Sequence, residues 1–316
     1  MKRLIWFAPV VVLVGCGGGG GGGGSGSAGV TPFSTWSAIT PNSTVRVDGN
    51  SQEVSYTANS STDRVTSVSS VSPNQDGAYY QSSYGSDGRA NAVDLRSAKG
   101  TTVSWSTAKG DTIARIASGP YAGINAAISA GEGANAGLSA EPLLNGWNYQ
   151  SFGVWITGRG QGSGTAGAMS VGNPTAVNTM PQSGTATYSG STGGIYLGPA
   201  GEYFLTTSNM SANVNFGSRQ ISFATSGTVG ATPNMVLGGN SPVSVPALNI
   251  SGLLAYSADS TQFSGVVKSA GGANANQMSG TAVGKFYGPS AREIGGTFSM
   301  KGSGMETFAG AFGGKR

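Results

Sequence analysis

The chain has 316 residues, of which 9% are charged, 38% are hydrophobic and 55 are glycine. This composition excludes a Leu/Glu/Lys-rich helical protein, and the low charge argues against a disordered chain. An all-β protein with many turns fits it best. The length allows one large domain or two modest ones.

The first residues have the pattern of a bacterial export signal over residues 1–15. Lys2 and Arg3 form a basic start, and Leu4–Val14 is an apolar run that is too short to span a bilayer. The sequence Leu13-Val-Gly-Cys16 resembles the lipobox of bacterial lipoproteins. The resemblance implies cleavage before Cys16 and acylation of this residue. The alternative is an ordinary signal peptide with an incidental cysteine.

Lipidation at Cys16 would attach the mature chain to a membrane through lipid. Cys16 is the single cysteine of the sequence, so no internal disulfide is expected. By the same resemblance, Gly17 in place of an aspartate implies the outer membrane, with the periplasmic side and the cell surface both open. The Gly-rich residues 16–30 predict a flexible tether that spans about 20 Å as a random coil.

The sequence also argues against several chemical functions. The absence of histidine excludes catalytic triads and metal sites that depend on it, and no cofactor is expected. The basic residues are scattered, so we expect no nucleic-acid partner. Ser106–Lys109 fits Ser-x-x-Lys, but the accompanying motifs are missing, and a strand end with a turn is the better interpretation.

Two further patterns associated with enzymes are weak. Gly162, Gly164 and Gly167 fit Gly-x-Gly-x-x-Gly, but no βαβ pattern surrounds them, and chance explains them in a glycine-rich chain. The acidic residues are scattered without a close pair on one strand. We therefore expect that the chain is not an enzyme.

Residues 31–116 predict a small antiparallel β subdomain. Ser43–Asp48, Gln52–Thr57 and Thr101–Ser106 alternate apolar and polar residues, as half-buried strands do. Turn-forming clusters separate them, among them Asp48–Ser51. Residues 117–146 are rich in Ala and Gly and predict a connection or a weak buried strand.

Residues 147–316 predict about eight or nine longer strands, which are typical of an antiparallel barrel or sandwich. The abundant glycines suit the strong curvature of a closed barrel. Met210–Phe216 and Arg219–Ala224 predict a tight hairpin, with a glycine at Gly217-Ser218 supplying a positive φ.

Gly284–Phe298 (GKFYGPSAREIGGTF) resembles the closing signature of the transferrin-binding protein B β-barrel domain. Its marker residues are Phe286, Tyr287, Gly288, Pro289, Gly295, Gly296 and Phe298. Four other segments resemble the family in the same order: Ser183–Gly190, Val214–Phe223, Phe263–Gly265 and Phe308–Arg316. The resemblance covers residues 147–316.

The resemblance implies an eight-stranded barrel, preceded by a handle-like subdomain at residues 31–116. One barrel implies a single-lobe surface lipoprotein, expected to be a monomer. Such a protein would bind a protein or a solute, present it to an outer-membrane receptor, and serve iron or haem uptake. The alternatives are a structural or adhesive lipoprotein without cargo, and a lipocalin-like barrel that holds a small ligand.

The signature also has a direct physical interpretation. Gly288-Pro289 predicts a turn after the strand that ends at Tyr287, and Ser290 is a candidate cap for the short turn that follows. Gly295-Gly296 predicts a tight bend into the next strand. Arg292 and Glu293 are expected to face solvent.

Overall fold

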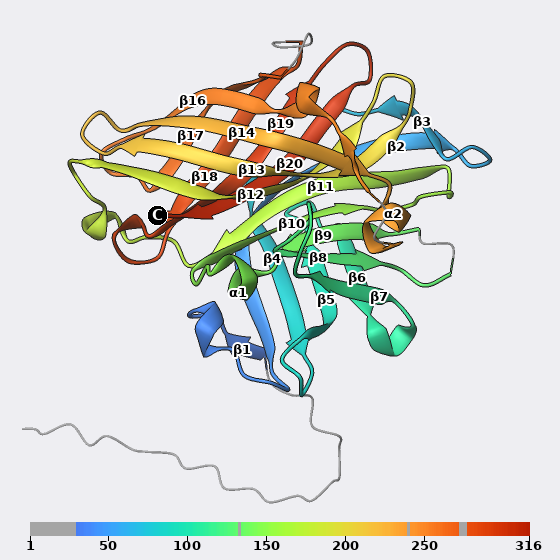
Figure 1. The fold of residues 1–316 in the computed structure, drawn as a ribbon, viewed down its shortest axis with the longest axis horizontal. Helices are drawn as coiled ribbons and strands as arrows, with labels where there is room; N and C mark the ends of the chain where they lie inside the picture. Colours follow the sequence, from blue (N-terminus) through green and yellow to red (C-terminus); the bar gives the residue numbers. More distant parts are fainter. Residues whose placement is uncertain (1–29, 132–133, 239–240, 272–276) are drawn as a thin grey trace, which may run out of the picture.

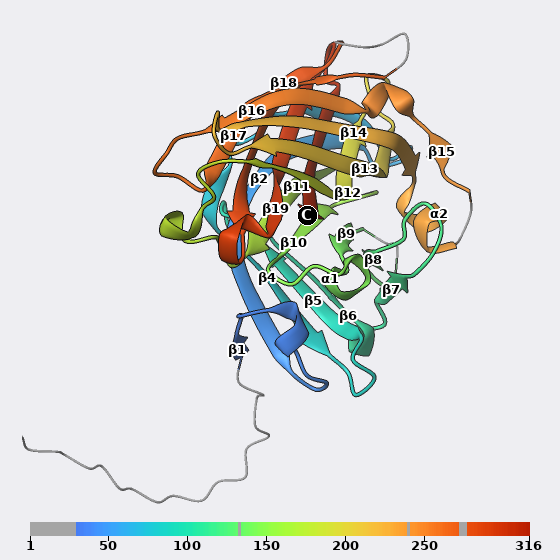
Figure 2. The same ribbon diagram turned by 60° about the vertical axis from the view of Figure 1, so that its left-hand side comes forward.

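The computed structural model describes residues 30–131, 134–238, 241–271 and 277–316. Strands dominate this part of the chain, and they form two sheets that pack against each other (Figures 1 and 2). The predicted all-β class, with an N-terminal β subdomain before an eight-stranded antiparallel barrel, is confirmed. Cys16, the predicted signal peptide and all but the last residue of the predicted tether lie outside the described residues.

The first sheet has eleven strands within the described ranges, in the order β6-β5-β4-β2-β11-β10-β9-β8-β7, with β1 and β3 added to β2. The bounds are β1 Val30–Pro32, β2 Thr44–Asn59, β3 Arg64–Val68, β4 Gln75–Tyr84, β5 Ala90–Arg96, β6 Thr102–Ser106, β7 Thr112–Ile116, β8 Ile124–Ile128, β9 Ala136–Ala140, β10 Gln150–Ile156 and β11 Ser163–Gly172. Helices η1 (Trp36–Ala38), η2 (Thr107–Lys109) and α1 (Pro142–Asn145) lie in the connections. The end strands β6 and β7 are neighbours, so the sheet is nearly closed.

Strand β2 is longer than the alternation pattern predicts. Asp48–Ser51 was expected to be a turn, but it is extended within one strand of 16 residues. Strands β4 and β11 pair with β2 on its two sides across this segment, and a bulge at Gly49/Asn50 absorbs the irregularity. Pairing on both sides therefore outweighs the local turn preference of these residues.

The strand pairing divides the chain later than expected. We expected residues 147–316 to form the barrel, but β10 and β11 pair with β9 and β2 in the first sheet. The predicted connection at residues 117–146 contains β8, β9 and α1. Both strands are buried, and their Ala and Gly residues fit into this packed environment. The composition alone did not distinguish such buried strands from a linker.

The second sheet is the barrel. In the described part of the chain its eight strands follow the order β13-β12-β20-β19-β18-β17-β16-β14, and pairing between β13 and β14 closes it. The bounds are β12 Thr185–Leu197, β13 Tyr203–Asn215, β14 Gln220–Ala231, β16 Ile250–Tyr256, β17 Gln262–Ser269, β18 Ser279–Tyr287, β19 Glu293–Lys301 and β20 Thr307–Lys315. The short β15 (Val243–Ser244) adds to β14. Helices η3 (Val177–Thr179), α2 (Pro233–Gly238), η4 (Pro246–Leu248) and η6 (Pro289–Ala291) lie in loops.

Large side chains fill the interior of the barrel. Its buried cluster includes Tyr188, Met210, Phe223, Leu254, Phe263, Phe286, Phe298, Met300, Phe308 and Phe312. Phe298 and Phe308 meet edge to face, with ring centroids 5.0 Å apart. An eight-stranded barrel is narrow enough for side chains to fill. The lipocalin-like alternative, in which the interior holds a ligand, therefore does not fit this structure.

The signature segment forms the end of β18, a turn and the start of β19. Gly288 has φ 71°, and Ser290 and Ala291 also have positive φ, so the turn is tighter than the predicted capped helical turn. The N-cap position belongs to Gly288, which has no side chain, and Ser290 lies inside the turn. The expected bend at Gly295-Gly296 is wrong, because both residues lie in β19.

These two glycines allow close packing. A Cβ on Gly296 would collide with the Val283 carbonyl oxygen of β18. A Cβ on Gly295 would lie 2.9 Å from Gln150 Oε1, which belongs to the first sheet. Both glycines therefore let neighbouring strands approach where side chains would separate them.

Glu293 joins the two sheets. It was expected to face solvent, but only 4% of its surface is exposed. Its carboxylate accepts backbone N–H bonds from Asn148 at 2.6 Å, Tyr149 at 2.9 Å and Gln150 at 3.0 Å. Burial raises the pKa of Glu293, and these hydrogen bonds and Lys315 oppose the shift.

Two further hydrogen bonds cross the same junction. Gln52 donates to the Phe298 carbonyl oxygen at 2.5 Å, and the hydroxyls of Ser170 and Tyr287 lie 2.9 Å apart. Burial raises the pKa of Tyr287 to about 12. The junction is therefore polar as well as tightly packed, and it holds the barrel against the first sheet in one orientation.

The predicted hairpin of β13 and β14 is present, with Asn215 opposite Gln220. The positive φ belongs to Arg219, at 57°, and not to Gly217 as predicted. None of the helices within the described ranges has the length and apolarity required for a membrane crossing.

Candidate functional site

One end of the barrel carries a pocket, which we call the mouth pocket. It has a volume of about 400 Å³ and is lined by Tyr196, Phe204, Ser244, Val245, Pro246, Ala247, Leu248, Ser269, Gln277, Met278 and Glu306. These residues come from the ends of β12, β13 and β17, from the residues just before β18 and β20, and from the connection that contains α2, β15 and η4 (Figure 2). The pocket therefore lies where loops, rather than strands, determine the surface.

Two aromatic rings form one wall of the mouth pocket. Tyr196 and Phe204 are directly opposite each other in the pairing of β12 and β13. Their rings are parallel within 5°, with centroids 6.4 Å apart. Tyr196 also meets Phe308 edge to face at 6.4 Å, so the wall rests on the packed interior of the barrel.

Glu306 provides the negative charge of the pocket. Its Oε1 accepts a hydrogen bond from the Tyr196 hydroxyl at 2.6 Å, and its Oε2 accepts one from the Ser303 backbone N–H at 3.3 Å. Burial raises the pKa of Tyr196, and the charges of Glu306 and Glu202 raise it further. The mouth is therefore an aromatic site in a negative field.

The apolar rim of the pocket is fixed by hydrogen bonds to the barrel. Val245 donates to the Thr228 carbonyl oxygen at 2.9 Å, and Asn249 Oδ1 accepts from the Thr228 hydroxyl at 2.7 Å. Ala270 donates to the Asn249 carbonyl oxygen at 2.7 Å. These contacts hold the segment that includes Pro246 and Leu248 in place, so the barrel itself determines the shape of the rim.

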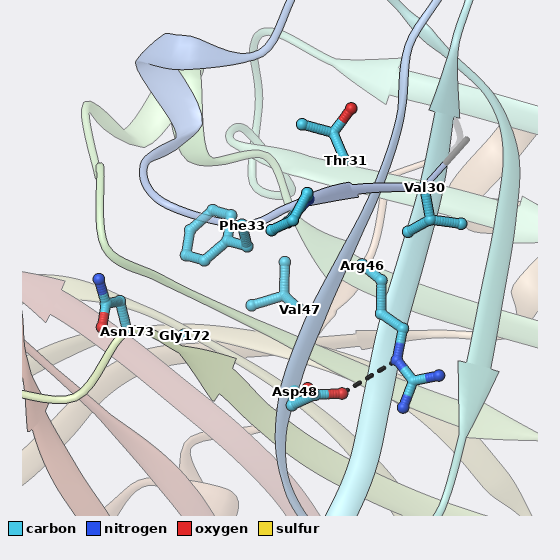
Figure 3. Close-up of a pocket in the computed structure, with 9 residues that line it drawn as sticks. Val30, Thr31, Phe33, Arg46, Val47, Asp48, Gly172 and Asn173 are labelled. Carbon is cyan, nitrogen blue, oxygen red and sulfur yellow. Dashed lines mark hydrogen bonds and ion pairs between the residues drawn. The ribbon is translucent and has the colours of Figure 1, made fainter. Parts of the chain in front are cut away.

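A second depression, the edge groove, lies beside β1 (Figure 3). It also measures about 400 Å³, and its lining residues are Val30, Thr31, Pro32, Phe33, Arg46, Val47, Asp48, Gly172 and Asn173. β1 pairs with β2 only as far as Arg46, and β11 pairs with β2 from Gly49. The groove therefore occupies the gap between the two partner strands.

The charges of the edge groove neutralise each other. Arg46 Nε lies 3.0 Å from Asp48 Oδ1, as Figure 3 shows, and the Arg46 guanidinium lies 3.9 Å from the centroid of the Tyr79 ring. Both charged groups thus have partners within the chain. The mouth pocket, where Glu306 faces aromatic rings, is the better candidate for binding.

The residues that the sequence analysis singled out lie outside the mouth pocket. The marker residues of the signature contribute to the barrel core and to its junction with the first sheet, and none of them lines the mouth pocket. Ser106–Lys109 lies at the end of β6 and in η2, which confirms the interpretation as a strand end and turn. Residues 30–131, 134–238, 241–271 and 277–316 contain no group of three or more His, Cys, Asp or Glu that could hold a metal ion.

Sequence reasoning missed Tyr196, Phe204 and Glu306. The Gly198–Gly201 turn with an aromatic residue shortly before and after it could have indicated the ring pair, because a hairpin places such residues opposite each other. Glu306 is 110 positions from Tyr196, and no local pattern connects them.

Comparison with protein families finds a match to the barrel. Residues 180–316 match the family described as C-lobe and N-lobe beta barrels of Tf-binding protein B. Comparison with curated protein sequences finds no match.

Several solved structures are similar to this chain. A mutant transferrin-binding protein B from Haemophilus parasuis Hp5 has 14% identity, covering 88% of this chain and 78% of that one, with a TM-score of 0.42. The isotype 1 protein from serogroup B Neisseria meningitidis has 12% identity, covering 88% and 77%, with a TM-score of 0.37. The crystal structure of a surface lipoprotein has 12% identity, covering 84% of this chain and 98% of that one, with a TM-score of 0.42.

Proposed function

We propose that this chain is a surface lipoprotein that binds a partner through the mouth of the barrel. The match of residues 180–316 to the barrels of transferrin-binding protein B supports this proposal. The partner is a protein or a solute, which the lipoprotein presents to an outer-membrane receptor. The process that it serves is the uptake of iron or haem.

The observation that carries this proposal is the mouth pocket. The barrel interior is filled, so binding takes place at the loops rather than inside. The pocket combines an aromatic wall, an apolar rim and one partly buried carboxylate. Binding sites usually combine apolar walls with a few polar groups that orient the ligand.

The proposed attachment is a lipid on Cys16. The tether that follows would hold the folded body away from the membrane, at a distance of about 20 Å. We propose that the protein acts as a monomer on the outer face of the outer membrane. Digestion of intact cells with a protease, followed by detection of the chain, tests this exposure; survival of the chain on intact cells but not on lysed cells would contradict it.

Binding is tested with the full-length protein purified in detergent. The wild type, Phe204→Ser in the mouth pocket and Leu253→Ser on the outer barrel wall are compared by biolayer interferometry against transferrin, haem and haem proteins. Leu253 is 58% exposed and lies outside the pocket, so it is the matched control. We expect one ligand that binds the wild type and Leu253→Ser equally, and Phe204→Ser about tenfold more weakly.

The role in nutrient supply needs a separate experiment. A strain without this chain should grow more slowly than the wild type when iron is limiting, and the full-length gene should restore growth. Unchanged growth would contradict the iron role. Loss of adherence without any growth defect would favour the structural or adhesive alternative.

A further inference from the structure

The charged side chain that lines the mouth pocket is a carboxylate. The described residues that line the mouth pocket include Glu306 and neither Lys nor Arg. The charge of Glu202, on the neighbouring hairpin, also acts on Tyr196. The negative charge of Glu306 inside the pocket favours a positively charged ligand.

Hydrogen bonds hold the carboxylate of Glu306 in place but occupy only part of its acceptor positions. Its Oε1 accepts a hydrogen bond from the Tyr196 hydroxyl, and its Oε2 accepts one from the Ser303 N–H. An ionised carboxylate offers about four acceptor positions. The tyrosine fixes its direction, so the remaining positions are available for a donor that enters the pocket.

The ring pair beside Glu306 suits the same ligand. Tyr196 and Phe204 line the pocket and are both only partly buried, so part of each side chain is exposed. Aromatic faces attract ammonium and guanidinium groups, because the ring face carries partial negative charge. Val245, Pro246 and Met278 line the rest of the pocket, and they suit an apolar stem rather than a compact hydrated ion.

We propose that the mouth pocket binds a guanidinium or ammonium group on an apolar stem, namely an arginine or lysine side chain on the surface of a protein partner. The proposal rests on the proposed function, and it specifies the chemistry of the same site. The cation pairs with Glu306, stacks against Tyr196 and Phe204, and buries its methylene groups against the apolar rim. The volume of about 400 Å³ admits such a side chain with part of its neighbours.

The edge groove does not offer this chemistry. It already contains a cation, because Arg46 pairs with Asp48 and covers Tyr79. An incoming basic group would have to displace Arg46 from both contacts. This groove therefore supplies the internal control for the experiment.

The test uses capped tripeptides with alanine on both sides of a central arginine, lysine, citrulline or glutamate. Their binding to the full-length protein in detergent is measured by saturation-transfer NMR and titration. We expect the arginine and lysine peptides to bind with millimolar Kd, and citrulline, the neutral equivalent of arginine, to bind about tenfold more weakly. Equal binding of arginine and citrulline would overturn the proposal.

Three variants locate the binding. Glu306→Gln keeps an acceptor for the Tyr196 hydroxyl and should weaken the arginine peptide about tenfold, whereas Asp48→Asn in the edge groove should leave its Kd unchanged. Phe204→Leu keeps the apolar volume and should weaken it about threefold through loss of the aromatic face. Thermal melting by circular dichroism checks that each variant is folded. An effect of Asp48→Asn but not of Glu306→Gln would refute this location.

This test and that of the proposed function fail separately. A partner that binds through the mouth and is unaffected by Glu306→Gln would refute the basic side chain and leave the binding function intact. Arginine peptides that bind through Glu306, with no partner on the panel, would support the pocket chemistry and count against the proposed partners.

Discussion

Glu293 shows how far a residue's environment can differ from its local pattern. The sequence Ala291-Arg-Glu293 resembles an exposed turn, and Arg292 is exposed. The neighbouring Glu293 is buried, because the N–H groups of Asn148–Gln150 meet its carboxylate. These partners lie 143 to 145 positions earlier in the chain. A short sequence window contains no information about them.

We expect Glu293→Gln to lower the free energy of unfolding by about 1–3 kcal/mol at about pH 5, because a single amide oxygen does not replace two carboxylate oxygens that accept three N–H groups. Urea denaturation followed by tryptophan fluorescence measures the loss. Arg292→Gln, on the exposed neighbour, is the control and should change stability by no more than about 0.5 kcal/mol. Equal stability of both variants would show that the contact contributes nothing.

The difference in the free energy of unfolding between the wild type and Glu293→Gln should depend on pH. The pKa of Glu293 is raised above 4.5 in the folded chain, so the native state keeps this proton to higher pH than the unfolded state. The corresponding stabilisation is present at low pH and is lost as the pH rises through the raised pKa. Urea denaturation should therefore show that the stability difference between the wild type and Glu293→Gln becomes smaller from about pH 4 to 7. A difference that grows with pH would contradict a raised pKa of Glu293.

At the scale of elements, pairing partners decided where strands end. Asp48–Ser51 has the composition of a turn, yet it is part of β2 because β4 and β11 pair with it on both sides. Gly49 is required here for close packing and not for a turn, because a Cβ at this position would collide with the Ser170 carbonyl oxygen of β11. By contrast, the hairpin of β13 and β14 was predicted correctly because its signal is local.

Gly49→Ala should separate β2 from β11 and lower the free energy of unfolding by roughly 2–4 kcal/mol, because the clash is with backbone. Gly217→Ala is the matched control. Its Cβ would meet the nearest atom, Asn215 Oδ1, at 3.4 Å, and its φ lies outside the left-handed region. We expect a change within about 1 kcal/mol there. Urea unfolding compares the two, and similar losses would show that the close approach at Gly49 is not limiting.

At the scale of the whole molecule, the two sheets pack against each other through their shared junction, with the first sheet on one side of the barrel (Figures 1 and 2). The residues that line the mouth pocket lie at one end of the barrel. The proposed lipidation site, Cys16, precedes the first sheet in the sequence, whereas the barrel strands begin at Thr185. The anchoring and the binding parts are thus separate segments of the chain.

Cys16→Ala should abolish the membrane attachment without changing the folded body. We expect loss of labelling with an alkyne fatty acid, and loss of the chain from the washed outer-membrane fraction. The thermal melting of the folded body, followed by circular dichroism, should be the same for both proteins. Continued labelling of Cys16→Ala would exclude this residue as the lipidation site.

The sequence by itself determined the all-β class and the barrel, because period-two alternation, hairpin turns and the Gly284–Phe298 signature are local patterns. Only the tertiary structure placed β10 and β11 in the first sheet, buried Glu293 and brought Tyr196 to Glu306. These features depend on contacts between distant segments, and their energy comes from pairing and burial that neighbouring residues do not encode. The signature forms the connection between β18 and β19 of the barrel, whereas the candidate binding site consists of residues that the signature does not contain.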